Sequence, residues 1–198
     1  MNDIHPPNLA PEAVVYSKIK LTPVRDFTEN FLRALKKELT LKLQGEAVEF
    51  FEDTPLPLLM LAFDLAKNLC PEAVLRLKTG ERVLLFDHQT VPVLRDEEII
   101  QKFANQEEKE LKNRDFLPEI VFKLSEIWEE TAAKDYFQRI DLALERVYDL
   151  LRPAMVATLV GEGPALLFLL TQYSLYGNVA EIFYQEDLKT KPINITLL

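Results

Sequence analysis

The feature that most constrains the fold is one strand, turn and helix pattern that recurs in both halves of the chain. With no gap, an offset of 107 residues sets residues 57–61 (PLLML) on residues 164–168 (PALLF). The same offset pairs positions of the following strands: Leu75 with Ile182, and Leu77 with Tyr184. We therefore predict two similar α/β units in tandem, although apolar patterning alone would also make two such stretches look alike.

Hydrophobic periodicity predicts the elements of each half. In the first half we expect strands at 14–21 and 47–51, a hairpin of 73–77 with 82–86, a helix carrying Phe27, Phe31, Leu35 and Leu39, and a helix ending at 68–69. In the second half we expect strands at 120–124, 155–160, 181–184 and 193–197, with helices at 136–151 and 165–176. The predicted organisation is an N-terminal segment (1–13), a first unit (14–95), a charged helical linker (96–117) and a second unit (118–198).

The charge balance opposes nucleic-acid and membrane partners. The 198 residues contain 23 Lys and Arg against 32 Asp and Glu, a formal net charge of −9, which repels polyanionic surfaces. The N-terminus lacks the regions of a signal peptide, and the apolar runs 56–63 and 164–170 are shorter than the roughly 20 residues of a membrane-spanning helix. We therefore expect a cytoplasmic protein with no DNA-binding surface and no membrane segment.

Cysteine and histidine are too scarce for most metal and nucleophilic sites. Cys70 is the one cysteine, so no internal disulfide forms, and with His5 and His88 it does not complete a zinc site. We expect no metal and no cofactor. His88 follows a predicted strand and is a candidate general acid or base, but a surface residue is the simpler interpretation. A conventional hydrolase is the least favoured function, because paired catalytic groups at recognisable spacing are absent.

The turn at residues 161–164 (GEGP) is the most informative segment for a binding site. A strand that runs through a glycine-rich turn into a helix presents unpaired N–H groups and the positive end of the helix dipole. Gly161 and Gly163 let an anion approach the backbone. Glu162 opposes an anion, and the spacing matches neither a dinucleotide motif nor a P-loop. The alternative is a tight turn without a ligand.

Tyrosines and basic residues supply the remaining candidates. Tyr173, Tyr176 and Tyr184 fall near the end of the predicted helix and in the next strand. Their rings can stack on nucleobases, or they can line a protein interface or the core. Candidates for a local positive surface are Lys18, Lys20, Arg76, Lys78 and Lys189.

Residues 155–195 combine a strand ending in the glycine turn, a helix that starts with bulky apolar residues, a strand ending in tyrosine, and a hairpin. The matching residues are Gly161, Gly163, Pro164, Leu166, Leu167 and Tyr184. In this order they resemble the small CRISPR-associated ring-nuclease family, which binds cyclic oligoadenylate on a ferredoxin-like fold. The resemblance implies two ferredoxin-like units, each with two helices and a small mixed sheet. Because family members act as symmetric oligomers around their ligand, a fused pair can reproduce one dimer in a single chain, and we expect a homodimer.

The departures from the family pattern concern its chemistry. Glu162 stands in place of a basic residue, Tyr173 in place of a catalytic histidine, and Gln185 in place of an aspartate. At the corresponding places of the first unit stand Ala66 and Lys78. The resemblance therefore implies a retained fold and a lost catalytic set.

Two functions follow as expectations. The first is a CRISPR-associated accessory protein of antiviral defence that binds a cyclic oligoadenylate second messenger, with at most weak, metal-independent, phosphodiesterase-like ring-nuclease activity and unknown catalytic residues. The expected ligand-binding residues are Gly161, Gly163, Tyr173, Tyr176 and Lys78. The second is a non-catalytic protein-interaction or adaptor subunit, which docks on a larger assembly through exposed aromatic and apolar surface.

Overall fold

The computed structural model of the protein describes residues 17–19, 21, 28–88 and 117–196. The chain divides into two units, Met1–Val93 and Leu94–Leu198, and each is described by itself. The predicted N-terminal segment lies outside the described residues, as does the predicted linker apart from its last residue, Leu117. These two predictions stay predictions.

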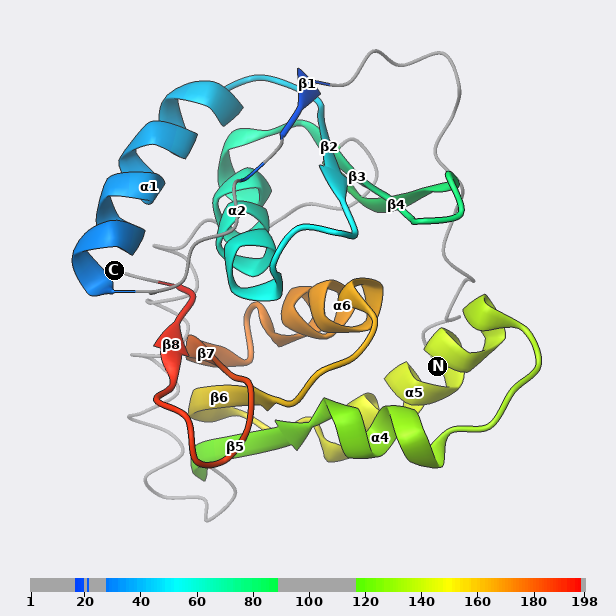
Figure 1. The fold of residues 1–198 in the computed structure, drawn as a ribbon. Coiled ribbons are helices and arrows are strands. Elements are labelled where there is room, and N and C mark those ends of the chain that lie inside the picture. Colours follow the sequence, from blue (N-terminus) through cyan, green and yellow to red (C-terminus); the bar gives the residue numbers. More distant parts are fainter. Residues whose placement is uncertain (1–16, 20, 22–27, 89–116, 197–198) are drawn as a thin grey trace. The chain divides into compact units, whose positions relative to one another are not determined.

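The first unit is a four-stranded sheet with two helices on one face (Figure 1). Its elements are β1 (Ser17–Lys18), α1 (Glu29–Leu43), β2 (Val48–Phe51), α2 (Leu56–Leu69), β3 (Glu72–Arg76) and β4 (Arg82–Asp87). The strand order is β1-β2-β3-β4, with β4 antiparallel to β3 and the other pairs parallel. Right-handed crossovers between neighbouring parallel strands place both helices on the same face, and α1 packs against α2.

Among the described residues, the second unit has the same strand topology and one more helix than the first (Figure 1). Its elements are β5 (Leu117–Lys123), α4 (Leu124–Glu130), α5 (Tyr136–Leu150), β6 (Ala154–Val160), α6 (Ala165–Leu175), β7 (Val179–Gln185) and β8 (Ile193–Asn194). The strand order is β5-β6-β7-β8, with only the last pair antiparallel. The short helix α4 was not expected from the sequence.

The predicted fold class is confirmed: two mixed α/β units lie in tandem, each with a small mixed sheet. They are consistent with ferredoxin-like units in having helices layered on a four-stranded sheet. Leaving α4 aside, the elements of each unit follow the order β-α-β-α-β-β, whereas the ferredoxin-like motif runs β-α-β-β-α-β. The likeness therefore lies in the layers.

The 107-residue offset of the sequence also holds in the structure. It carries the two ends of α1 onto the two ends of α5. It also carries the N-caps onto each other: Thr28 accepts the N–H of Phe31, and Asp135 accepts the N–H of Gln138. The strand register shows the same offset. Phe50 pairs with Leu75 in the first unit, and the residues 107 positions later, Ala157 and Ile182, pair with each other in the second.

The second unit has six more residues than the first between its first strand and the next equivalent helix. Lys18 pairs with Glu49, and Glu119 pairs with Val156, which is Glu49 shifted by 107. Lys18 and Glu119 are therefore equivalent, although only 101 residues separate them. Since α1 and α5 differ by 107, the second unit has six extra residues in this interval, and α4 lies within it.

Helix α2 of the first unit and helix α6 of the second are equivalent in topology, and most of their residues are buried. In α2 every residue from Pro57 to Lys67 is buried, and in α6 the residues from Ala165 to Leu169 are buried. Against the sheets lie Phe63 of α2, which contacts Phe86 of β4, and Phe168 of α6. Within the described part of the chain, no helix has both the length and the hydropathy that a membrane span requires.

Candidate functional site

The candidate site lies where three parallel strands of the second unit end together. Lys123 of β5 is in register with Val160 of β6, which is in register with Gln185 of β7. Beyond these ends lies an open depression of about 340 Å³, lined by Lys123, Ser125, Glu126, Val160, Gly161, Glu186, Asp187, Leu188 and Lys189. The carboxyl ends of parallel strands are where open α/β sheets bind their ligands.

The charges of the depression are mixed. Lys123 Nζ lies 2.9 Å from Glu126 Oε1, and Asp187 Oδ1 accepts the backbone N–H groups of Lys189 and Thr190. The lining thus holds two lysines and three carboxylates, and two of the carboxylates already have donors. Such a lining suits a ligand with one anionic group and several hydrogen-bond donors better than it suits a dense polyanion.

Gly161 lines this depression, but its backbone is engaged by the protein. Its N–H donates to the Gln185 carbonyl at 2.9 Å, and its own carbonyl accepts from the Tyr184 hydroxyl at 3.3 Å. A Cβ at Gly161, where φ is +106°, would lie 2.2 Å from Ser125 Oγ. The glycine therefore allows α4 to pack closely on the turn, and its N–H is not the open anion cradle that the sequence suggested.

The other predicted ligand residues are dispersed. Gly163 is exposed beside the depression and does not line it. Tyr173 and Tyr176 pack edge to face, with ring centroids 6.1 Å apart, at the far end of α6, about 15 Å from the helix start at a rise of 1.5 Å per residue. Lys78 lies in the hairpin of the first unit, where its N–H donates to Glu52 Oε2 at 2.8 Å.

Tyr184 has a structural position. Its ring packs edge to face on Phe168, with centroids 5.9 Å apart, and its hydroxyl holds the turn through Gly161. Burial, together with the carboxylates of Glu186 and Glu162, raises the pKa of Tyr184 to about 12. The hydroxyl therefore stays protonated and donates throughout the neutral range.

His88 and Cys70 also have structural surroundings. His88 Nε2 lies 2.7 Å from the Lys67 carbonyl in the last turn of α2, and its ring stacks on Phe86 at 4.7 Å, so it caps the helix. Cys70 is buried, its Sγ lies 3.2 Å from the Leu43 carbonyl, and burial raises its pKa to about 12. Among the described residues, no group of three or more His, Cys, Asp or Glu is placed to hold a metal.

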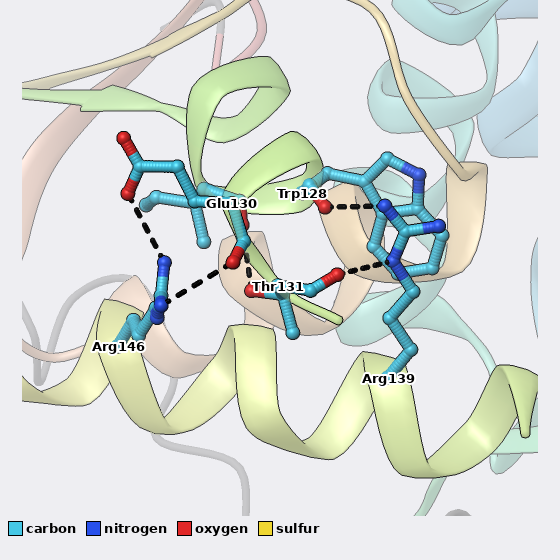
Figure 2. A network of polar contacts seen from close by, with 6 residues as sticks. Trp128, Glu130, Thr131, Arg139 and Arg146 are labelled. Atoms are coloured by element: carbon cyan, nitrogen blue, oxygen red, sulfur yellow. Dashed lines mark hydrogen bonds and ion pairs between the residues drawn. The ribbon is translucent and has the colours of Figure 1, made fainter. Parts of the chain in front are cut away.

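Sequence reasoning missed the contacts that fix α4. Arg139 of α5 donates from Nε to the Thr131 carbonyl at 2.7 Å and from Nη2 to the Trp128 carbonyl at 2.6 Å, and its guanidinium lies 3.8 Å above the Trp128 ring (Figure 2). Two turns further along α5, Arg146 Nη1 donates to the Glu130 carboxylate at 3.1 Å. Arg139 thus provides hydrogen-bond donors for the Trp128 and Thr131 carbonyls at the C-terminal end of α4. Because Ser125 and Glu126 at the other end of α4 line the depression, this contact positions one wall of the site.

Replacing Arg139 with alanine is expected to lower the free energy of unfolding of the second unit by about 2 kcal/mol. The change removes two charge-assisted hydrogen bonds and a cation–π contact. Arg146→Ala is the matched control, because that ion pair is solvent-exposed and such pairs contribute about 0–1 kcal/mol. Urea unfolding followed by fluorescence of Trp128, the one tryptophan, measures both. Equal losses in the two variants would contradict the assignment.

The structure thus brings one predicted ligand residue, Gly161, into a depression whose walls come from the ends of β5 and β6, from α4, and from the loop after β7. Lys123, Ser125 and Lys189 add a hydroxyl and two ammonium groups to these walls. Comparisons with protein-family models, with curated proteins and with solved structures give no match to this chain.

Proposed function

We propose that the second unit binds a small ligand of the cyclic oligoadenylate class at the carboxyl-edge depression. The observation that supports this is the depression itself, which at about 340 Å³ falls in the range of roughly 300–1,000 Å³ of small-molecule sites. Lys123 and Lys189 offer two cationic donors there, and Ser125 offers a hydroxyl. The protein would then serve as an accessory protein of CRISPR antiviral defence, as the sequence resemblance implies.

The charges restrict how such a ring can bind. Because three carboxylates share the lining with two lysines, one phosphodiester group next to Lys189 is better accommodated than several. The remaining carboxylates then accept hydrogen bonds from the adenine amino groups and the ribose hydroxyls. Only part of the ring enters a depression of this size, and the rest stays in solvent.

Binding is proposed in preference to cleavage. Tyr173 stands where the family has its histidine, and it lies at the end of α6 opposite the depression. Burial raises the pKa of Tyr173, so it is a poor general base at neutral pH. We therefore expect any ring opening to be weak and secondary to binding.

Calorimetric titration with cyclic tetra- and hexa-adenylate tests the proposal. We expect heat of binding for the unmodified chain and a dissociation constant roughly tenfold weaker for Lys189→Glu, because charge reversal at the wall opposes a phosphate. Lys191→Glu, an exposed position outside the lining, is the control and should leave binding unchanged. Chromatography of the titrated ligand detects ring opening. Absence of heat at high ligand concentration, with the protein folded, contradicts the proposal.

Exposed apolar side chains favour the adaptor function as a second candidate. In the second unit Tyr148, Leu150 and Met155 are 43%, 50% and 38% exposed, at the end of α5 and the start of β6. Large apolar side chains gathered at a surface are typical of protein interfaces. Light scattering of the purified chain tests self-association, including the expected homodimer, and purification from native extract tests association with other proteins. A chain that stays monomeric and alone in both contradicts this candidate.

A further inference from the structure

Helix α4 is fixed at its C-terminal end by side chains of the next helix, α5. The Arg139 guanidinium donates to the carbonyls of Trp128 and Thr131, at 2.6 and 2.7 Å, and lies 3.8 Å from the centre of the Trp128 ring (Figure 2). The Tyr136 ring packs against the same indole edge to face, with ring centroids 6.1 Å apart. Trp128 therefore contacts both a cation and an aromatic ring of α5, and its surroundings depend on where this end of α4 lies.

The N-terminal end of α4 is fixed by a different set of contacts, and these lie at the depression. A Cβ at Gly161 would lie 2.2 Å from Ser125 Oγ, so the first turn of α4 packs directly on the backbone of the glycine turn. Lys123, the last residue of β5, donates from Nζ to both carboxylate oxygens of Glu126, at 2.9 and 3.3 Å. All four of these residues line the depression. An occupant of the depression therefore meets the first turn of α4.

The two ends of α4 are too close together to move independently. Ser125 and Trp128 are three residues apart, which is about 4.5 Å along a helix axis and places their side chains on the same side. In a helix of seven residues, the backbone hydrogen bonds between residues four apart join the first turn to the last. Leu124 and Ile127 are buried and hold the helix on the core of the unit. A shift at Ser125 is therefore expected to reach Trp128.

We propose that α4 couples the depression to the contact between Trp128 and Arg139, so that Arg139 is a positioning residue for the ligand. The part of this coupling that concerns a ligand rests on the function proposed for the depression. A ligand that donates a hydrogen bond to Glu126 competes with Lys123 for that carboxylate, and it thereby favours one position of α4 over another. Because coupling between two sites is reciprocal, a change in the contact at Trp128 alters the affinity for the ligand.

Titration of the full chain with cyclic tetra-adenylate tests the coupling, with calorimetry and Trp128 fluorescence recorded on the same samples. Trp128 is the one tryptophan of the chain, and we expect its emission to change in proportion to the heat. Arg139 is not among the described residues that line the depression. Arg139→Ala should nevertheless weaken binding roughly fivefold and reduce the change in emission.

Arg152→Ala is the matched control for Arg139→Ala. Arg152 also donates to two carbonyls at the end of a helix, those of Asp149 and Leu151, but these contacts reach neither α4 nor the depression. Binding and emission should therefore stay as in the unmodified chain. Arg139→Lys keeps the charge but loses the fork of donors that bonds both carbonyls, so we expect it to restore only part of the affinity. Unchanged affinity in Arg139→Ala contradicts the positioning role.

A measurement without ligand separates failure of the coupling from failure of the proposed function. The Cβ of Gly161→Ala pushes against Ser125, so we expect the emission of Trp128 to change in the folded protein. Gly163→Ala, whose Cβ would meet only Phe168 Cε2, should leave the emission unchanged. Circular dichroism shows whether each variant is folded. If Gly161→Ala is not, Ser125→Thr brings a methyl group to the same contact from the side of α4.

The outcomes decide the two proposals separately. Changed emission in the folded Gly161 or Ser125 variant supports the coupling, and absence of heat in the titration then contradicts only the proposed ligand. Unchanged emission in these folded variants overturns the coupling, whether or not the ligand binds. Heat of binding without any change in the emission of Trp128 overturns it as well.

Discussion

Replacing Gly161 with alanine is expected to lower the free energy of unfolding of the second unit by about 4 kcal/mol. Two costs add: a non-glycine residue at a φ of +106° is strained by about 1–3 kcal/mol, and overpacking costs about 1–3 kcal/mol more. The added Cβ would lie 2.2 Å from Ser125 Oγ and 2.6 Å from Ser125 Cβ. Helix α4 must then move away from the turn. Denaturant unfolding monitored by Trp128 of α4 measures the loss.

Gly163→Ala is the matched control for this variant. It lies two residues away, and its Cβ would meet only Phe168 Cε2, at 3.3 Å, so we expect a loss of no more than about 1 kcal/mol. Combining Gly161→Ala with Ser125→Gly relieves the steric part but not the backbone strain, and should recover part of the stability. Equal stability of the two alanine variants would contradict the packing described here for α4.

Replacing Glu49 with alanine is expected to destabilise the first unit by about 3–5 kcal/mol. The change leaves Arg76 and Arg82 next to each other without the carboxylate that both contact, and breaking one side of a buried ion pair costs about this much. The rate of Cys70 labelling under mild denaturant measures the loss, because this thiol is buried in the same unit. The transition reported by Trp128 should not shift in this variant if the units unfold separately.

A triple variant tests the role of these charges more directly than Glu49→Ala does. Glu49→Val with Arg76→Phe and Arg82→Asn gives the first unit the residues that the second has in the same register. The variant removes the buried carboxylate together with both guanidinium groups, and two of the three replacements are apolar. Because replacing a whole buried ion cluster by apolar residues is often neutral or stabilising, we expect the variant to recover most of the stability that Glu49→Ala loses. A triple variant less stable than Glu49→Ala would show that these positions of the first sheet do not tolerate the residues found at the equivalent positions of the second.

Most of the fold could be predicted because its signals are local or periodic. The second helix of the first unit, the hairpin after it and the helix at 136–151 are confirmed to within a few residues as α2, β3 with β4, and α5. Helix α4 was missed because seven residues carry little periodicity and because its end is fixed by Arg139, a contact from the next helix. A contact of that kind has no signature in the sequence around α4 itself.

The candidate site could be predicted only in part. The glycine turn lies at the edge of the second sheet where the depression opens, because a turn that leads from a strand into a helix lies at the end of that strand. Tyr173 and Tyr176 were grouped with it because they follow in sequence, yet α6 carries them to its other end. The cluster around Glu49 was not expected, because its partners are 27 and 33 residues away and meet it only through strand pairing.

Matching register in the two sheets has a consequence for which substitutions each unit tolerates. The register is defined by backbone hydrogen bonds between strands, and these bonds do not depend on which side chains project from the strands. The two sheets accordingly keep the same strand order with different side chains at equivalent positions, such as Glu49 and Val156. Substitutions of side chains on one sheet can therefore be tolerated without matching changes in the other.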